Sequence, residues 1–157
     1  MRKAIAVVLS AILAVFVCYE TDTYLHPRPA KAASQFANIV CDGYTPVSAA
    51  ADTQVITAGG SNNFVYICSY NLASGVADNW SIVEGTGSTC GTNTKALVGA
   101  TTAAAGIQFT ATTGGSVNYG GGTGAVTKTT VAGNNVCILR STAGPLSGVI
   151  GSTQMPF

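Results

Sequence analysis

Apolar and polar residues alternate over short stretches of the chain with the period of β-strands, and the richest stretch is Phe64–Tyr70. With a period of two, the even-numbered residues from Phe64 to Tyr70 lie on one face of this strand, and Val65 and Ile67 lie on the other. Neither face is polar, which favours a central strand of a sandwich. A second strand, 80–84, follows after a loop, and the two strands are predicted to form an antiparallel hairpin.

Shorter strands are predicted along the rest of the chain, separated by turns rich in Gly, Asn and Pro. Helical periodicity is missing beyond the N-terminus, and 19 glycines suit many tight turns. The expected strands cover residues 36–41, 54–57, 95–98, 106–111, 116–119, 136–140 and 146–150, and residues 125–131 also alternate small and threonine side chains. We therefore expect one all-β domain, a β-sandwich or jelly roll of eight or nine short antiparallel strands.

The N-terminus has the pattern of a secretory signal peptide. Arg2 and Lys3 precede an apolar run over residues 4–18, which is shorter than the ~20 residues of a membrane-spanning helix. Residues 30–32, Ala-Lys-Ala, match a cleavage motif. We predict a signal peptide at 1–32 and an exported domain at 33–157, located in the periplasm, on the cell surface or in the medium. The alternative is that residues 1–32 stay attached as a short membrane anchor.

Few charged residues remain after removal of this leader. The domain then has four acidic and three basic residues, a net charge of −1. It has no basic stripe for a nucleic acid and no basic amphipathic helix for a membrane surface. We expect neither partner. So weakly charged a chain has little electrostatic repulsion between copies, which favours a homo-oligomer.

Four cysteines remain in the predicted exported domain, Cys41, Cys68, Cys90 and Cys137. Zinc binding is the alternative use of four cysteines, but their spacings of 27, 22 and 47 residues contain no C-x₂-C pair. An even number in an oxidising compartment predicts two disulfides. Three connectivities are open. We favour Cys68–Cys90, whose members flank the predicted hairpin, together with Cys41–Cys137, which would join a first strand to the penultimate one.

Residues suited to catalysis are scarce. The only histidine, His26, lies in the predicted leader, and the four remaining acids are scattered along the sequence, so no triad, metal site or carboxylate pair is predicted. We expect neither an enzyme nor a cofactor. Aromatic rings can stack on sugars, and the available rings are Tyr66, Tyr70, Trp80 and Tyr119. Packing in the core is the commoner fate of such rings. The candidates for sugar contacts are Trp80 and Tyr119.

Four motifs resemble those of a group of small uncharacterised β-rich proteins encoded by bacteriophages and some bacteria. The motifs are Tyr66-Ile-Cys68, Val83-Glu-Gly-Thr-Gly-Ser-Thr-Cys-Gly-Thr92, Asn135-Val-Cys-Ile-Leu139 and Ser147-Gly-Val-Ile150. The resemblance covers about residues 38–154. It implies a virion-associated or surface structural module, and it implies a trimer for the homo-oligomer.

The function expected from the sequence is therefore that of an exported structural or adhesive β-sandwich protein, derived from a phage virion module. The alternative is a carbohydrate-binding, lectin-like module of the cell surface or secretome that binds a surface glycan.

Overall fold

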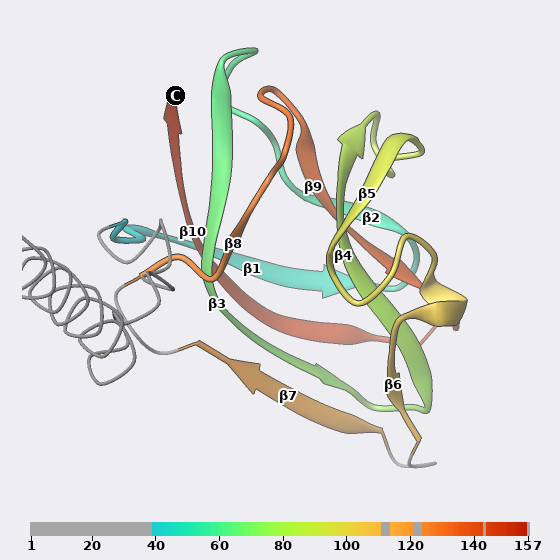
Figure 1. Ribbon diagram of the computed structural model, residues 1–157. Coiled ribbons are helices and arrows are strands. Elements are labelled where there is room, and N and C mark those ends of the chain that lie inside the picture. The colour runs from blue at the N-terminus through green and yellow to red at the C-terminus, as the bar shows by residue number, and fades with distance from the viewer. Residues whose placement is uncertain (1–38, 111–113, 121–123, 143, 157) are drawn as a thin grey trace, which may run out of the picture. The chain divides into compact units, whose positions relative to one another are not determined.

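Ten antiparallel strands and one short 3-10 helix form the regular structure of residues 39–110, 114–120, 124–142 and 144–156, which this computed structural model describes (Figure 1). The predicted leader at 1–32 lies outside these residues. All described residues belong to one compact unit, Gln35–Phe157. The elements are β1 (Gly43–Ala49), β2 (Thr53–Ile56), β3 (Asn63–Ser74), β4 (Asp78–Thr86), β5 (Thr92–Val98), η1 (Ala103–Ala105), β6 (Ile107–Phe109), β7 (Gly115–Tyr119), β8 (Thr127–Lys128), β9 (Asn135–Arg140) and β10 (Leu146–Pro156).

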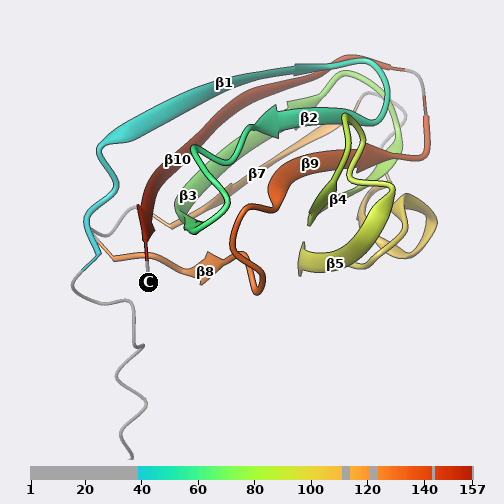
Figure 2. The same ribbon diagram turned by 90° about the horizontal axis from the view of Figure 1, so that it is seen from above.

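The strands form two five-stranded sheets. One has the order β1-β10-β3-β7, with β8 also paired to β3, and the other has the order β2-β9-β4-β5, with β6 also paired to β4 (Figure 2). The pairs β1–β10, β2–β9, β3–β7 and β4–β5 alternate between the sheets, as in a long hairpin rolled into a jelly roll. The predicted all-β sandwich is confirmed. The ten strands exceed the expected eight or nine, and the short β8 lies within the alternating stretch at 125–131.

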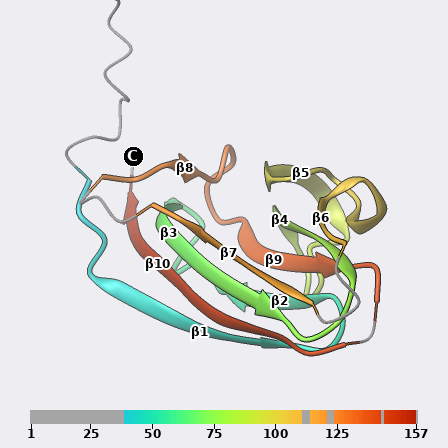
Figure 3. The same ribbon diagram turned by 90° about the horizontal axis from the view of Figure 1, so that it is seen from below.

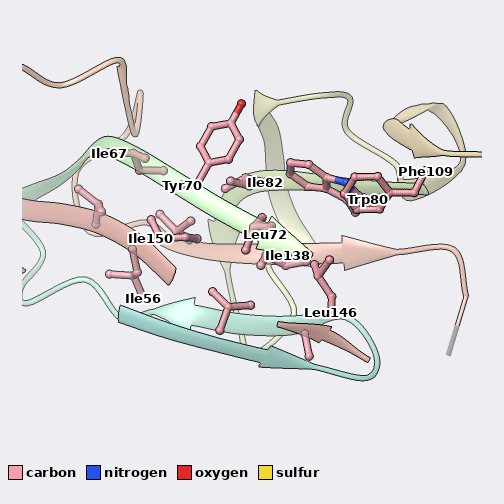
Figure 4. Packing of buried hydrophobic residues seen from close by; sticks show 14 residues of the cluster. Ile56, Ile67, Tyr70, Leu72, Trp80, Ile82, Phe109, Ile138, Leu146 and Ile150 are labelled. Atoms are coloured by element: carbon pink, nitrogen blue, oxygen red, sulfur yellow. The ribbon is translucent and has the colours of Figure 1, made fainter. Parts of the chain in front are cut away.

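The core lies between the two sheets and receives apolar side chains from both. Every second residue of the long strands faces it, since side chains alternate across a strand. Figure 4 shows these side chains meeting between the layers. The buried members are Val47, Ala49, Ile56, Val65, Ile67, Tyr70, Leu72, Trp80, Ile82, Phe109, Val136, Ile138, Leu146 and Ile150.

A β-bulge at Cys68 changes which residues of β3 share a face. Along β10, Ser152 is opposite Ile67 while its neighbour Gly151 is opposite Ser69, so Cys68 is an extra residue on β3. One extra residue reverses the alternation beyond it. Tyr70 therefore faces the core instead of sharing the outer face with Cys68, and its predicted placement is wrong.

The predicted hairpin of residues 64–70 with 80–84 is also wrong. Both strands exist, but β3 pairs with β10, β7 and β8, whereas β4 pairs with β9, β5 and β6 in the other sheet. The chain crosses from one sheet to the other at the turn between them (Figure 3). Consecutive strands of a jelly roll often change sheets in this way.

The first strand begins later than predicted. Residues 39–42 have no regular structure, and β1 begins at Gly43 and includes Pro46. β1 is an edge strand. An edge tolerates proline because the missing N–H can face away from the neighbouring strand.

Candidate functional site

The first disulfide joins Cys41 to Cys68, with a Cα–Cα separation of 6.0 Å. Cys41 lies in the irregular segment before β1, and Cys68 is the bulged residue of β3. Ile39 and Cys41 pack with Tyr66 and Cys68 on the outer face of β3. The disulfide therefore holds the start of the described chain over a strand that would otherwise expose apolar side chains.

The second disulfide joins Cys90, in the loop between β4 and β5, to Cys137 on β9, with a Cα–Cα separation of 5.9 Å. Both cysteines are fully buried. The loop folds back closely over Gly85, where a side-chain Cβ would come within 2.7 Å of the Cys90 carbonyl oxygen. Cys90 itself has a φ of 52°. A glycine at 85 thus permits the close approach that the disulfide needs.

All four predicted cysteines form disulfides, but the favoured pairing of Cys68–Cys90 and Cys41–Cys137 is wrong. It depended on a β3–β4 hairpin and on a first strand beside the penultimate one. In the structure Cys68 lies on β3 of one sheet, and its partner Cys41 lies in the segment that packs over β3. Cys137 lies on β9 of the other sheet, and its partner Cys90 lies in the loop between β4 and β5.

Asp78 and Arg140 form an ion pair whose side chains have no exposed surface. The Arg140 Nε donates to Asp78 Oδ2 at 2.7 Å, and the Arg140 Nη1 donates to the Ala49 carbonyl oxygen at 2.6 Å. Asp78 Oδ1 accepts from the Thr142 N–H at 3.0 Å. These contacts join the end of β1, the start of β4, and the end of β9 with the loop after it, so the ion pair holds these segments together at one end of the sandwich.

Glu84 is a second buried carboxylate, at the other end of the inward face of β4. Its Oε2 accepts from the Thr130 N–H at 2.7 Å and from the Val131 N–H at 3.3 Å, and its Oε1 accepts from the Thr130 hydroxyl. That hydroxyl accepts in turn from Lys95 Nζ at 3.0 Å. Glu84 is thus satisfied by the loop between β8 and β9 and holds that loop on the sandwich.

These buried acids were not predicted as a group, although a signal was present. Asp78, Trp80, Ile82 and Glu84 share one face by the period of two, so an acid stands at each end of an apolar inward row. Asp78 and Glu84 both have protein donors. In the part of the chain that the structure describes, no three His, Cys, Asp or Glu residues gather to hold a metal.

Trp80, the first predicted stacking residue, is fully buried. Its ring lies 5.9 Å from Phe109 and 5.9 Å from Tyr70 between centroids, within the core (Figure 4). The predicted ligand contact is therefore wrong for Trp80, because no ring face reaches the surface. Among the residues that the structure describes, its indole Nε1 has no hydrogen-bond partner.

Tyr119, the second predicted stacking residue, ends β7 and is 54% exposed. It is directly opposite Tyr70 on β3, and the two rings stack with centroids 5.5 Å apart and planes 19° from parallel. Burial, and secondarily Tyr119, raise the pKa of Tyr70 above its ordinary value. Tyr70, another of the rings considered for stacking, contacts both Trp80 and Tyr119 and so joins the two candidates.

Over the described ranges, none of the helices has the length and hydropathy of a membrane span. No protein-family model, curated protein or solved structure matches this chain.

Proposed function

We propose that this chain is an exported, non-enzymatic structural or adhesive protein that works as a homo-oligomer. The observation that carries the proposal is that the buried carboxylates and the cysteines of the described domain all stabilise the fold. Asp78 and Glu84, the buried acids of the described residues, hold neighbouring segments in place at opposite ends of β4. The four cysteines fasten two more segments. A domain built in this way suits mechanical durability outside the cell.

Export is the first part of the proposal. The two disulfides favour an oxidising, extracellular environment. The full chain should be expressed in an exporting bacterial host and fractionated. We expect a product beginning at Ala33, or within two residues of it, outside the cytoplasm, with no free thiol. An intact chain with reduced cysteines in the cytoplasm would contradict this part.

The adhesive role can be tested with beads that carry the exported, oxidised protein. We expect these beads to attach to host cells or to each other more than beads carrying the same protein after reduction and alkylation. Equal attachment of the two bead types would refute the role. The phage origin in this proposal rests on the sequence resemblance, and virion genes beside the coding gene would support it.

A carbohydrate-binding module is the second candidate, and the exposed ring of Tyr119 favours it. Stacking on Tyr70 holds that ring in a fixed orientation, which lowers the entropy cost of a sugar contact. On a glycan array, Tyr119→Ala should lose binding while Tyr44→Ala keeps it. Tyr44 is the matched control because it is 72% exposed on β1, at the opposite edge of the same sheet. If both variants lose glycan binding, or if neither does, the carbohydrate-binding function is refuted.

A further inference from the structure

The last strand of one sheet, β7, has only β3 as a neighbour, so its other edge has no strand beside it among the described residues. An open edge presents backbone N–H and C=O groups to any extended chain that approaches. β7 consists of Gly-Ser-Val-Asn-Tyr, with no charged residue and no proline. It pairs with β3 over five residues without a register shift.

The other outer strands carry features that oppose strand addition. β1 contains Pro46, β2 has a register shift against β9, and β5 has Lys95, two register shifts against β4 and a left-handed residue, Asn93, with a φ of 55°. β6 has three residues and β8 has two. Among the described outer strands longer than four residues, β7 alone has no proline, no charged residue and no register shift.

We propose that β7 pairs antiparallel with β7 of a second copy of this chain, with the two-fold axis at Val117. This inference names an interface for the homo-oligomer of the proposed function, and in that sense rests on it. The pair would join two five-stranded sheets into one continuous sheet. An isologous contact of this kind closes at two copies.

The sequence of β7 is self-complementary in this register. Val117 lies opposite Val117 of the partner subunit, and on the exposed outer face Ser116 lies opposite Asn118 of the partner subunit, where a hydroxyl can bond to an amide. No like charges meet. The apolar pair at the axis also continues the core, because Val117 packs against it.

The inward face of β7 adds an aromatic contact. Gly115 lies opposite Tyr119 of the partner subunit in this register, and Phe109 already covers Gly115, where a Cβ would come within 2.9 Å of Phe109 Cδ1. The half-exposed ring of Tyr119 would therefore settle against Phe109 across the interface. Aromatic side chains opposite strand glycines are a known stabilising pair. Pairing would bury the ring that the glycan hypothesis needs exposed.

The test is the mass of the exported, oxidised protein by light scattering over a range of micromolar concentrations. A five-residue strand pair is a small interface, so we expect a concentration-dependent dimer. Ser116→Lys combined with Asn118→Lys sets like charges opposite each other twice. It should raise the dissociation constant at least about tenfold. Ser116→Lys combined with Asn118→Glu sets opposite charges there and should keep the dimer.

The matched control is Ser48→Lys combined with Ser88→Lys, which adds the same two charges at exposed sites on β1 and on the loop after β4. It should keep the dimer, and circular dichroism should show that every variant is folded.

A monomer at all concentrations, a trimer, or a dimer unaffected by Ser116→Lys with Asn118→Lys would overturn the interface. A protein that is exported and adhesive yet monomeric would overturn this inference and leave the export and adhesive parts of the proposed function in place.

Discussion

Asp78 and Arg140 are buried together, and the charge of each side chain offsets the cost of burying the charge of the other. Removing one charge of such a pair leaves the other without a partner, which typically costs about 3–5 kcal/mol. Asp78→Asn keeps the shape of the side chain but removes its charge. We expect the free energy of unfolding to fall by about that amount. Urea unfolding followed by the fluorescence of Trp80, the only tryptophan, would measure it.

Asp52→Asn is the control for that substitution. Asp52 is exposed, and its Oδ1 accepts from the backbone N–H of Arg140 at 2.7 Å. An asparagine oxygen can accept the same bond, so the loss should be below about 1.5 kcal/mol. Equal losses for the two variants would show that burial of the Asp78 charge is not what matters.

Tyr70 links the stability of the domain to high pH. Its pKa is raised in the folded protein, first by burial and second by Tyr119. As the pH rises past about 10, the unfolded chain loses its Tyr70 proton before the folded chain does. The Tyr70 contribution is therefore fully present below pH 10 and is lost as the pH rises toward the folded pKa. The stability of Tyr70→Phe should fall less steeply above pH 10 than that of the wild type.

The control for this pH dependence is Tyr44→Phe, at a tyrosine that is 72% exposed. Urea midpoints between pH 8 and 11 would be compared for the three proteins. The wild type and Tyr44→Phe should follow the same curve. A Tyr70→Phe curve that also coincides with theirs would contradict the assignment.

Single residues also set the limit of what the sequence could predict locally. The alternation rule placed Val65 and Ile67 on the same face, as found, but no pattern revealed that Cys68 is bulged and that Tyr70 consequently faces the core. Trp80 was named as a candidate stacking ring although it stands in an apolar row with Ile82. The period of two was the better guide there, because burial follows the face of the strand.

Strand positions were easier to predict than strand partners. The apolar runs at β3, β4 and β9 were located correctly because β-branched and aromatic residues cluster there. Their partners depend on contacts far apart in sequence, such as β1 with β10 and β2 with β9. The nearest-neighbour hairpin was the simplest choice, and the fold instead sends β3 and β4 to different sheets. The wrong disulfide pairing follows from that error.

The two disulfides should differ in their contribution to stability. In the chain-entropy account, closing loops of 47 and 27 residues contributes about 4 and about 3.5 kcal/mol. Cys90 and Cys137 are also fully buried, whereas Cys41 is only partly buried. We expect the alanine double variant at 90 and 137 to lower the melting temperature more than the one at 41 and 68.

Hydrogen exchange would locate the two effects. Loss of Cys41–Cys68 should increase exchange mainly in residues 39–42, because that segment has no strand pairing of its own. Loss of Cys90–Cys137 should increase exchange in the loop between β4 and β5. A lower melting temperature for the variant at 41 and 68 would contradict the predicted order. It would mean that the packing of residues 39–42 on the outer face of β3 contributes more to stability than the longer disulfide loop does.

At the scale of the whole molecule, each sheet depends on the other to cover its apolar face. Ile67, Leu72 and Ile150 come from one sheet, and Ile82 and Ile138 come from the other, and all are fully buried. Weak charge, many glycines and the lack of helical periodicity were enough to predict such a sandwich. The way in which ten strands roll into it is set by long-range pairing, which composition does not specify.

This shared core predicts that the two sheets unfold in a single transition. Trp80 fluorescence reports on the sheet that contains β4, and far-ultraviolet circular dichroism reports on all strands. The two urea curves should coincide for the oxidised protein, and so should the loss of exchange protection at Leu72 on β3 and at Ile138 on β9. Ile138→Ala should shift both curves together by about 2–5 kcal/mol, because it leaves a cavity between the layers. Separate midpoints would mean that one sheet stays folded without the other. The side chains buried between the two sheets argue against that outcome.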